Sequence, residues 1–148
     1  MTPKLIPDLD ALIAHLGEFW ALYSDLNFRG KWSADLTEEQ FKSRLLKQFV
    51  SKDTLMFADW SESGELLYLL VLTREFCDDP EEALVWLLYC NTLIREHSDD
   101  LLRQMIQVAK SRGIKYLLAG TIRLTNSYSR WIGKFGFQPS TIIYKATI

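Results

Sequence analysis

Apolar residues recur every three or four positions over two stretches in the first third of the chain. The first stretch predicts an amphipathic helix over residues 9–25, with Asp8 as its N-cap. Its apolar positions are Leu9, Leu12, Ile13, Leu16, Phe19, Trp20 and Tyr23. The second stretch predicts a helix that ends near Val50 and opens with a capping box, because Gln40 stands three residues after Thr37.

Shorter apolar runs without helical spacing predict strands. Residues 54–58 and 66–76 are rich in strand-forming side chains, and the short Glu-Ser-Gly-Glu turn between them is typical of an antiparallel hairpin. Residues 83–89 are almost wholly apolar, as expected for a strand that is buried on both faces. Residues 4–6 can form at most a short first strand.

The second half of the chain predicts a strand–helix–strand unit. Ser98 is placed to cap a helix that Gly113 ends, and residues 114–119 are another apolar run of strand length. With the strand at residues 83–89, this order predicts two parallel strands joined by a right-handed crossover.

A short helix over residues 126–135, closed by Gly136, and a last strand at residues 142–144 complete the pattern. The chain shows no repeat, linker or internal boundary. We therefore predict one α/β domain over residues 1–148, with a mixed central sheet flanked by about four helices.

Composition narrows the range of functions. Apolar residues make up 48% of the 148 residues, enough for a real core. The net charge of −2 and the lack of a Lys/Arg block argue against a nucleic-acid partner. No run is apolar and long enough to span a membrane, and no secretory signal pattern opens the sequence, so we expect a cytoplasmic protein without a membrane partner.

Two cysteines, Cys77 and Cys90, lie far apart and lack the spacing of a zinc site. We expect both to be reduced thiols. No metal-ligand spacing, phosphate loop or Ser/His/Asp arrangement is present in the sequence, so we expect no metal.

Two segments resemble the GNAT superfamily of acyl-CoA-dependent N-acetyltransferases. The first is REHSDDLL at residues 95–102 with AKSRG at residues 109–113, where that family has its cofactor loop and central helix. The second is NSYSRWIGKFGF at residues 126–137, which is similar to the family's closing helix and its Gly-Phe ending. The element order over the whole chain is also similar to that of the family.

The resemblance implies a GNAT-like fold, acetyl-CoA as the cofactor, and acetyl transfer to an amine of a small molecule or a protein. The Arg130-Trp131 pair is similar to GNAT-like proteins encoded by tailed phages, including internal virion proteins. Such an origin would imply a place in the host cytoplasm or in the virion.

The resemblance places the cofactor contacts at Arg95, Glu96, His97 and Ser98. Glycines in this loop let backbone N–H groups and the helix N-terminus approach a pyrophosphate closely. Here Glu96 and His97 stand at the glycine positions, and two aspartates follow in the first helical turn. Carboxylates there repel an anionic ligand, so we predict weak or absent acetyl-CoA binding; the alternative role of these residues is to cap the helix.

The resemblance also implies groups for proton transfer. Ile132 stands where the family often has a tyrosine acid, and Tyr128, one turn earlier on roughly the same face, is the candidate substitute or, alternatively, a packing aromatic. Asn126 matches an asparagine that often contacts the cofactor arm, and it also suits an N-cap. Glu82, at the start of the predicted buried strand, is the candidate general base or part of a solvated acidic turn.

Two functions stay open at this point. The first is an active N-acetyltransferase, and the second is a non-catalytic GNAT-like module that binds a protein partner, for example as a phage virion or host-directed protein. A homo-oligomer and a different acyl or nucleotide ligand are further options. Arg130 and Trp131 would serve as interface anchors in a binding module, or Trp131 would pack the last helix onto the sheet.

Overall fold

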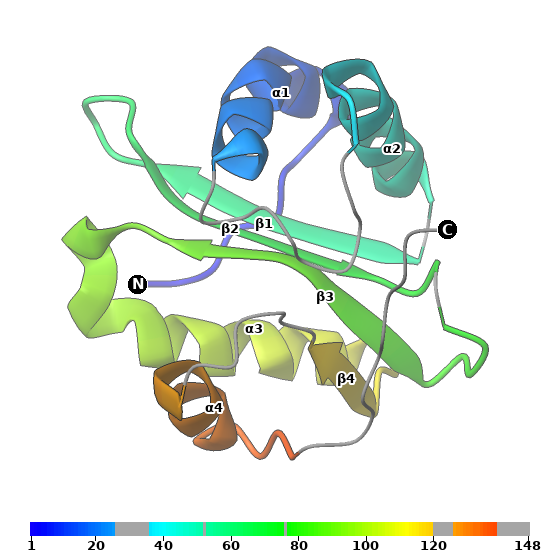
Figure 1. The fold of residues 1–148 in the computed structure, drawn as a ribbon, viewed down its shortest axis with the longest axis vertical. Coiled ribbons are helices and arrows are strands. Elements are labelled where there is room, and N and C mark those ends of the chain that lie inside the picture. The colour runs from blue at the N-terminus through cyan, green and yellow to red at the C-terminus, as the bar shows by residue number, and fades with distance from the viewer. Residues whose placement is uncertain (26–35, 52, 76, 120–125, 139–148) are drawn as a thin grey trace, which may run out of the picture.

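A four-stranded mixed sheet forms the centre of the protein in the computed structural model (Figure 1). The strands are β1 (Thr54–Trp60), β2 (Leu66–Thr73), β3 (Glu82–Cys90) and β4 (Tyr116–Ala119), and they lie side by side in chain order. The β1–β2 and β2–β3 pairs are antiparallel, whereas β3 and β4 are parallel. The predicted hairpin and the predicted parallel pair are both confirmed.

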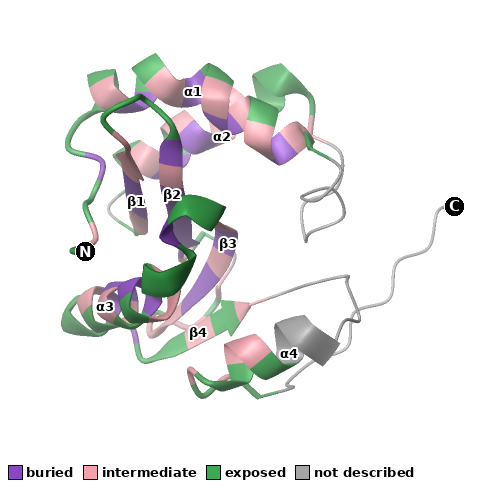
Figure 2. Cartoon of the chain, turned by 90° about the vertical axis from the view of Figure 1, so that its left-hand side faces the viewer, coloured by how far each residue is buried: buried purple, intermediate pink, exposed green. Residues whose placement is uncertain are grey.

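Helices cover both faces of this sheet (Figures 1 and 2). Helices α1 (Leu9–Ser24) and α2 (Glu38–Val50) lie on one face. Helices α3 (Ser98–Ser111) and α4 (Asn126–Gly133) lie on the other, and the short 3₁₀ helix η1 (Thr92–His97) leads into α3. The mixed α/β class predicted from the sequence is therefore confirmed.

The structure describes residues 1–25, 36–51, 53–75, 77–119 and 126–138; for residues 126–129 it describes the helical backbone only. The predicted strand at residues 142–144 lies outside this part of the chain. None of the described helices is both long and apolar enough to cross a membrane.

The predicted helix starts on the first face are confirmed in detail. The Asp8 carboxylate accepts the Ala11 N–H at 2.8 Å, which caps α1. In α2, the Gln40 N–H donates to the Thr37 hydroxyl at 3.2 Å, and the Thr37 N–H donates to the Gln40 side chain at 3.0 Å. This reciprocal pair is a capping box, and it fixes where α2 begins.

The first strand reduces to one bridge. Leu5 pairs with Phe57, and the two flanking hydrogen bonds join Ile6 N–H to Met56 O at 2.9 Å and Ala58 N–H to Lys4 O at 3.0 Å. These bonds hold the N-terminal segment against the outer edge of β1.

Some predicted boundaries shift by a few residues. Strand β2 stops at Thr73 rather than at residue 76 because a turn follows, in which the Cys77 N–H donates to the Arg74 carbonyl at 2.9 Å. Strand β4 begins two residues later than predicted, at residue 116.

The sheet separates two apolar clusters. Under α1 and α2, the aromatic rings of Tyr23 and Phe41 stack at 4.5 Å, and Phe41 lies 5.8 Å from the Trp86 ring of β3. Under α3 and α4, the fully or almost fully buried side chains include Phe57, Tyr68, Leu101 and Met105. Each helical layer is thus held by its own core.

Replacing Phe41 with alanine should lower the free energy of unfolding by about 3–5 kcal/mol, because the ring has 0% exposure and its removal leaves a cavity among other rings. Ile13→Ala is the matched control on α1, where the side chain is 50% exposed, and it should change stability by no more than about 0.5 kcal/mol. Urea unfolding of the two variants measures both values. Equal losses in the two variants would contradict this description of the core.

Candidate functional site

The described part of the sheet changes at the middle of β3. Among the described residues, β4 pairs with β3 from Glu82 to Val85, and β3 continues to Cys90. At that point Val71 pairs with Leu87 and Leu72 with Val85, so the register shifts by one residue and Trp86 lies in a β-bulge.

The bulge changes the course of β3. Trp86 and Leu87 both point into the core under α1 and α2, although consecutive strand residues normally alternate. Beyond Val85, no strand among the described residues pairs with the β4 side of β3. The last three residues of β3 are only half-buried, so the predicted burial on both faces is wrong for this end.

The carboxyl end of β3 leads directly to η1 and the N-terminus of α3. Crevices outside the carboxyl ends of parallel strands are common ligand sites, and a helix N-terminus there favours an anion. The opening beside β3 and the start of α3 therefore define the candidate site.

The η1 segment uses its own backbone donors. The Ile94 N–H donates to the Asn91 carbonyl at 3.1 Å, and the Leu93 N–H donates to the Asn91 side chain at 3.0 Å. The Ser98 N–H donates to the Arg95 carbonyl. These N–H groups are therefore not directed at a ligand, unlike those of a glycine-rich phosphate loop.

The predicted capping role of Ser98 is wrong. Ser98 is the first residue of α3, and its hydroxyl donates to the Arg95 carbonyl at 2.9 Å. His97 holds the N-cap position without a side-chain cap bond, because the preceding 3₁₀ turn gives it helical angles, φ −100° and ψ −5°. Arg95, Glu96 and His97 are exposed around this turn, so the four predicted cofactor residues do lie together.

The first turn of α3 is joined to α4 through Asp99. The Trp131 indole Nε1 donates to Asp99 Oδ1 at 2.9 Å, and Lys134 Nζ lies 3.4 Å from Asp99 Oδ2. The Trp131 hydrogen bond, and to a lesser extent the Lys134 and Arg103 charges, hold the pKa of Asp99 below its ordinary value. The carboxylate is thus held in its charged form in the first turn of α3.

The Trp131 side chain packs between α4 and the core beneath it. Its ring meets Phe135 edge-on at 5.4 Å, and the Arg103 guanidinium lies 5.2 Å from the centre of the same Phe135 ring. The packing role considered for Trp131 in the sequence is confirmed, and Arg130 beside it is exposed.

A cavity of about 10 Å³ lies between the sheet and helices α3 and α4, close to the smallest volume that holds one water molecule. Its lining is wholly apolar and consists of Leu70, Leu72, Val85, Leu88, Leu102, Ile106, Leu117, Ile132 and Phe137. Ile132, at the position of the family tyrosine, faces this cavity. No lining side chain can donate a proton.

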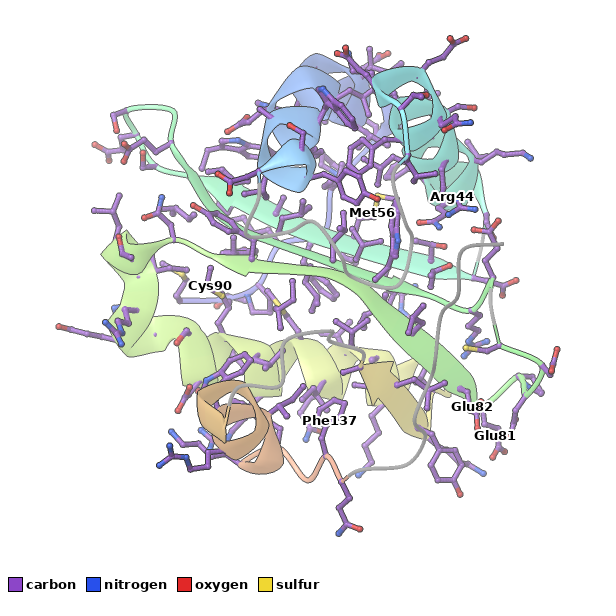
Figure 3. All side chains as sticks on the ribbon, in the orientation of Figure 1. Arg44, Met56, Glu81, Glu82, Cys90 and Phe137 are labelled. Carbon is purple, nitrogen blue, oxygen red and sulfur yellow. The ribbon has the colours of Figure 1, made fainter. Side chains whose placement is uncertain are left out.

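Glu82 lies at the opposite end of β3 from Cys90 (Figure 3). Eight residue steps at about 3.3 Å each separate them by roughly 26 Å. The adjacent Glu81 pairs with Lys115 at 2.8 Å, so this end of β3 is an acidic turn with its own ion pair. The structure does not bring Glu82 together with the α3 N-terminus.

Tyr128 and Asn126 belong to the first turn of α4. Their side chains lie outside the described part of the structure. Their predicted roles in proton transfer and cofactor contact therefore stay predictions.

No family model and no curated protein match the chain. Solved acetyltransferase structures match it over most of its length. The aminoglycoside 6'-N-acetyltransferase AAC(6')-IG from Acinetobacter haemolyticus is 18% identical, with a TM-score of 0.65 and coverage of 100% of this chain and 99% of that chain. A Trypanosoma brucei acetyltransferase is 10% identical, with a TM-score of 0.63 over 99% of this chain and 98% of that chain.

The chain has the GNAT acetyltransferase fold. A further GNAT-fold structure, AAC(6')-Iy, is 14% identical with a TM-score of 0.59, covers 91% of this chain and 93% of that chain, and was solved with a bisubstrate analogue that contains CoA. At these identities the likeness establishes the fold alone.

Two features of the described site bear on whether acetyl-CoA would fit. Among the described residues no strand pairs with the β4 side of β3 after the Trp86 bulge, an arrangement that suits an extended arm. The N–H groups of Leu93, Ile94 and Ser98 are used internally, and the Asp99 carboxylate lies in the first turn of α3, which does not favour a diphosphate. Within the described residues, no cluster of His, Cys, Asp or Glu could hold a metal ion.

One nucleophilic side chain near the site was not singled out from the sequence. Cys90 ends β3 opposite Tyr68, whose hydroxyl accepts the Lys4 N–H at 2.9 Å. Burial raises the pKa of the Cys90 thiol to about 11 and also raises the pKa of Tyr68. Both cysteines are free, as expected, but Cys90 stays protonated at neutral pH and is a poor nucleophile.

Iodoacetamide at pH 8 should therefore alkylate Cys77 well before Cys90. Burial also raises the pKa of Cys77, with smaller effects from Glu82 and Asp78, but the shift is smaller than that of Cys90. At pH 8 a thiol with a pKa of about 11 has a thiolate fraction of about one in a thousand. Mass spectrometry of the two peptides gives the rates, and urea-unfolded protein is the control; rapid labelling of Cys90 in folded protein would contradict the raised pKa of its thiol.

Proposed function

We propose that this protein is an N-acetyltransferase that uses acetyl-CoA, held weakly, to modify an amine of a small molecule or a protein. One observation carries the proposal: among the described residues, the pairing of β3 with β4 ends at Val85, beside the Trp86 bulge and before the connection into α3. The acetyltransferases that share this architecture support it by analogy.

In this proposal the residues of the chain align the ligand, exclude water and donate a proton. The edge of β3 after Trp86 would align the ligand by backbone hydrogen bonds, and the apolar cavity behind it would exclude water. Acetyl transfer to an amine needs a proton donor for the leaving group, and Ile132 cannot provide one. We propose Tyr128 as this donor, with Asn126 at the start of the same helix as a ligand contact.

A general base is the least defined part of the proposal. Glu82 was the candidate from the sequence, but it lies at the far end of β3. A base for the acceptor amine would have to be another group or a water molecule at the opening.

The second candidate is a non-catalytic GNAT-fold module that works by binding a protein, for example in a phage virion or in its host. The specific observation in its favour is the contact of Asp99 with Trp131 and Lys134, which holds the start of α3 against α4. A module of this kind would have no need for cofactor binding or for a proton donor.

A thiol-release assay with millimolar acetyl-CoA and a panel of aminoglycosides, polyamines and peptide amines separates the two candidates. The enzyme should release CoA with at least one acceptor, and Tyr128→Phe should lower turnover by at least tenfold, since general acid catalysis contributes about 10²–10⁴-fold. The melting temperature should barely change, because only a hydroxyl is removed.

Tyr116→Phe is the matched control, because this phenol on β4 is 56% exposed and should leave turnover unchanged. Activity that is indifferent to Tyr128→Phe would show that another group is the acid. No release with any acceptor would favour the binding module.

A further inference from the structure

One hydrogen-bond donor and two positively charged side chains lie near the Asp99 carboxylate. The Trp131 indole N–H and the Lys134 ammonium come from α4, at 2.9 Å and 3.4 Å. Arg103, one turn further along α3, lies 5.2 Å from the centre of the Phe135 ring and adds a smaller electrostatic contribution that favours the carboxylate form. An N–H donor and a cation that contact one anion, with a second cation one turn away, form the kind of arrangement that binds phosphate oxygens.

Asp99 lies on the face of α3 that lines the apolar cavity further along the helix. Leu102 and Ile106 of the cavity follow Asp99 by three and seven residues on α3, so they share its face. Ile132 of the cavity follows Trp131 directly on α4. An anion at the Asp99 position would therefore lie next to an apolar space between the two helices.

We propose that Trp131, Lys134 and Arg103 form a binding site for the phosphate group of a phosphate ester, and that the Asp99 carboxylate occupies this site as an internal anion. The contact then acts as an autoinhibitory lock: α4 stays closed on α3 while Asp99 is bound there. The proposal rests on the proposed function for the identity of the ester, an acyl-CoA, but the lock itself follows from the contacts of Asp99.

Asp99 has an advantage over any free phosphate. Asp99 is part of α3, so most of the entropy cost of placing its carboxylate is incurred when the helix folds. A free anion must therefore displace an intramolecular partner of high effective concentration. Weak binding of phosphate ligands to the unmodified protein follows from this competition.

Asp99→Asn tests the lock, because asparagine keeps the shape and an acceptor for Trp131 but removes the charge. Isothermal titration with CoA at low ionic strength should show a dissociation constant at least tenfold lower for Asp99→Asn than for the unmodified protein. The gain should shrink as salt is raised, since exposed charges are screened.

Asp100→Asn is the matched control. This aspartate lies in the same turn, but its carboxylate accepts from Gln104 Nε2 at 2.7 Å, and among the described residues it makes no hydrogen bond or ion pair with α4. Its CoA affinity should change by less than threefold. Equal gains in both variants would mean that charge removal alone acts, and would overturn the proposal.

The double variant Asp99→Asn with Lys134→Gln identifies the phosphate contact. It should lose most of the gain if Lys134 binds the phosphate, whereas retention of the full gain would overturn that assignment. Inorganic phosphate is the second probe: a gain for CoA with none for phosphate shows that the apolar part of the ester is needed. A melting curve for each variant confirms folding before titration.

The result is separable from the test of catalysis. If the unmodified protein turns over acetyl-CoA but Asp99→Asn gains no affinity, the lock is wrong and the enzyme proposal stands. If no acetyl transfer occurs in any variant but Asp99→Asn binds CoA tightly, the lock is right and the enzyme proposal fails.

Discussion

Strand β3 has neighbours of unequal length, and the position of the candidate site follows from this inequality. In the described part of the chain, it pairs with β2 over almost its whole length but with β4 over four residues. The surplus residue Trp86 is held in its bulge by Phe41 and Tyr23, whose rings lie 5.8 Å and 6.4 Å away. The core under α1 and α2 therefore holds the bulge at the point where the described β3–β4 pairing ends.

Two features meet at the carboxyl end of β3. The parallel β3–β4 pair and the crossover helix α3 form an arrangement that often holds an anionic ligand. The Asp99 carboxylate lies in the first turn of α3 there, bound to Trp131 and Lys134 of α4. Whether this contact opens and whether the protein transfers acetyl groups are separate questions.

Much of the fold could be predicted from the sequence, because local signals were strong. Asp8 and the Thr37 capping box fixed two helix starts, and Gly113, with φ of +84°, ended α3 as its position suggested. The parallel pairing followed from two apolar runs around one helix. The missing glycines in the cofactor loop indicated a segment unlike a phosphate cradle, and this stays a prediction.

The site itself was less predictable, because it depends on contacts between distant residues. The sequence marked Asp99 only as a helix-start charge, and its bond to Trp131, 32 residues away, needed the packing of α4 on α3. The 3₁₀ turn before α3 makes His97 the N-cap in place of Ser98. No sequence pattern indicated this turn, so the capping role of Ser98 was predicted wrongly. Glu82 was proposed as the general base because it stands at the start of a predicted strand. The sequence did not indicate at which end of that strand the site would lie.

The most direct test of this account is the indole N–H resonance of Trp131 in a ¹⁵N-labelled sample, assigned through Trp131→Phe and followed against pH. A pKa of Asp99 held below the ordinary value of 3.8 predicts that the resonance stays at its hydrogen-bonded position at neutral pH and shifts with a midpoint below that value. The shift should vanish in Asp99→Asn. A Trp131 resonance that does not respond to pH in this range, or responds equally in Asp99→Asn, would contradict the bond on which the closed site depends.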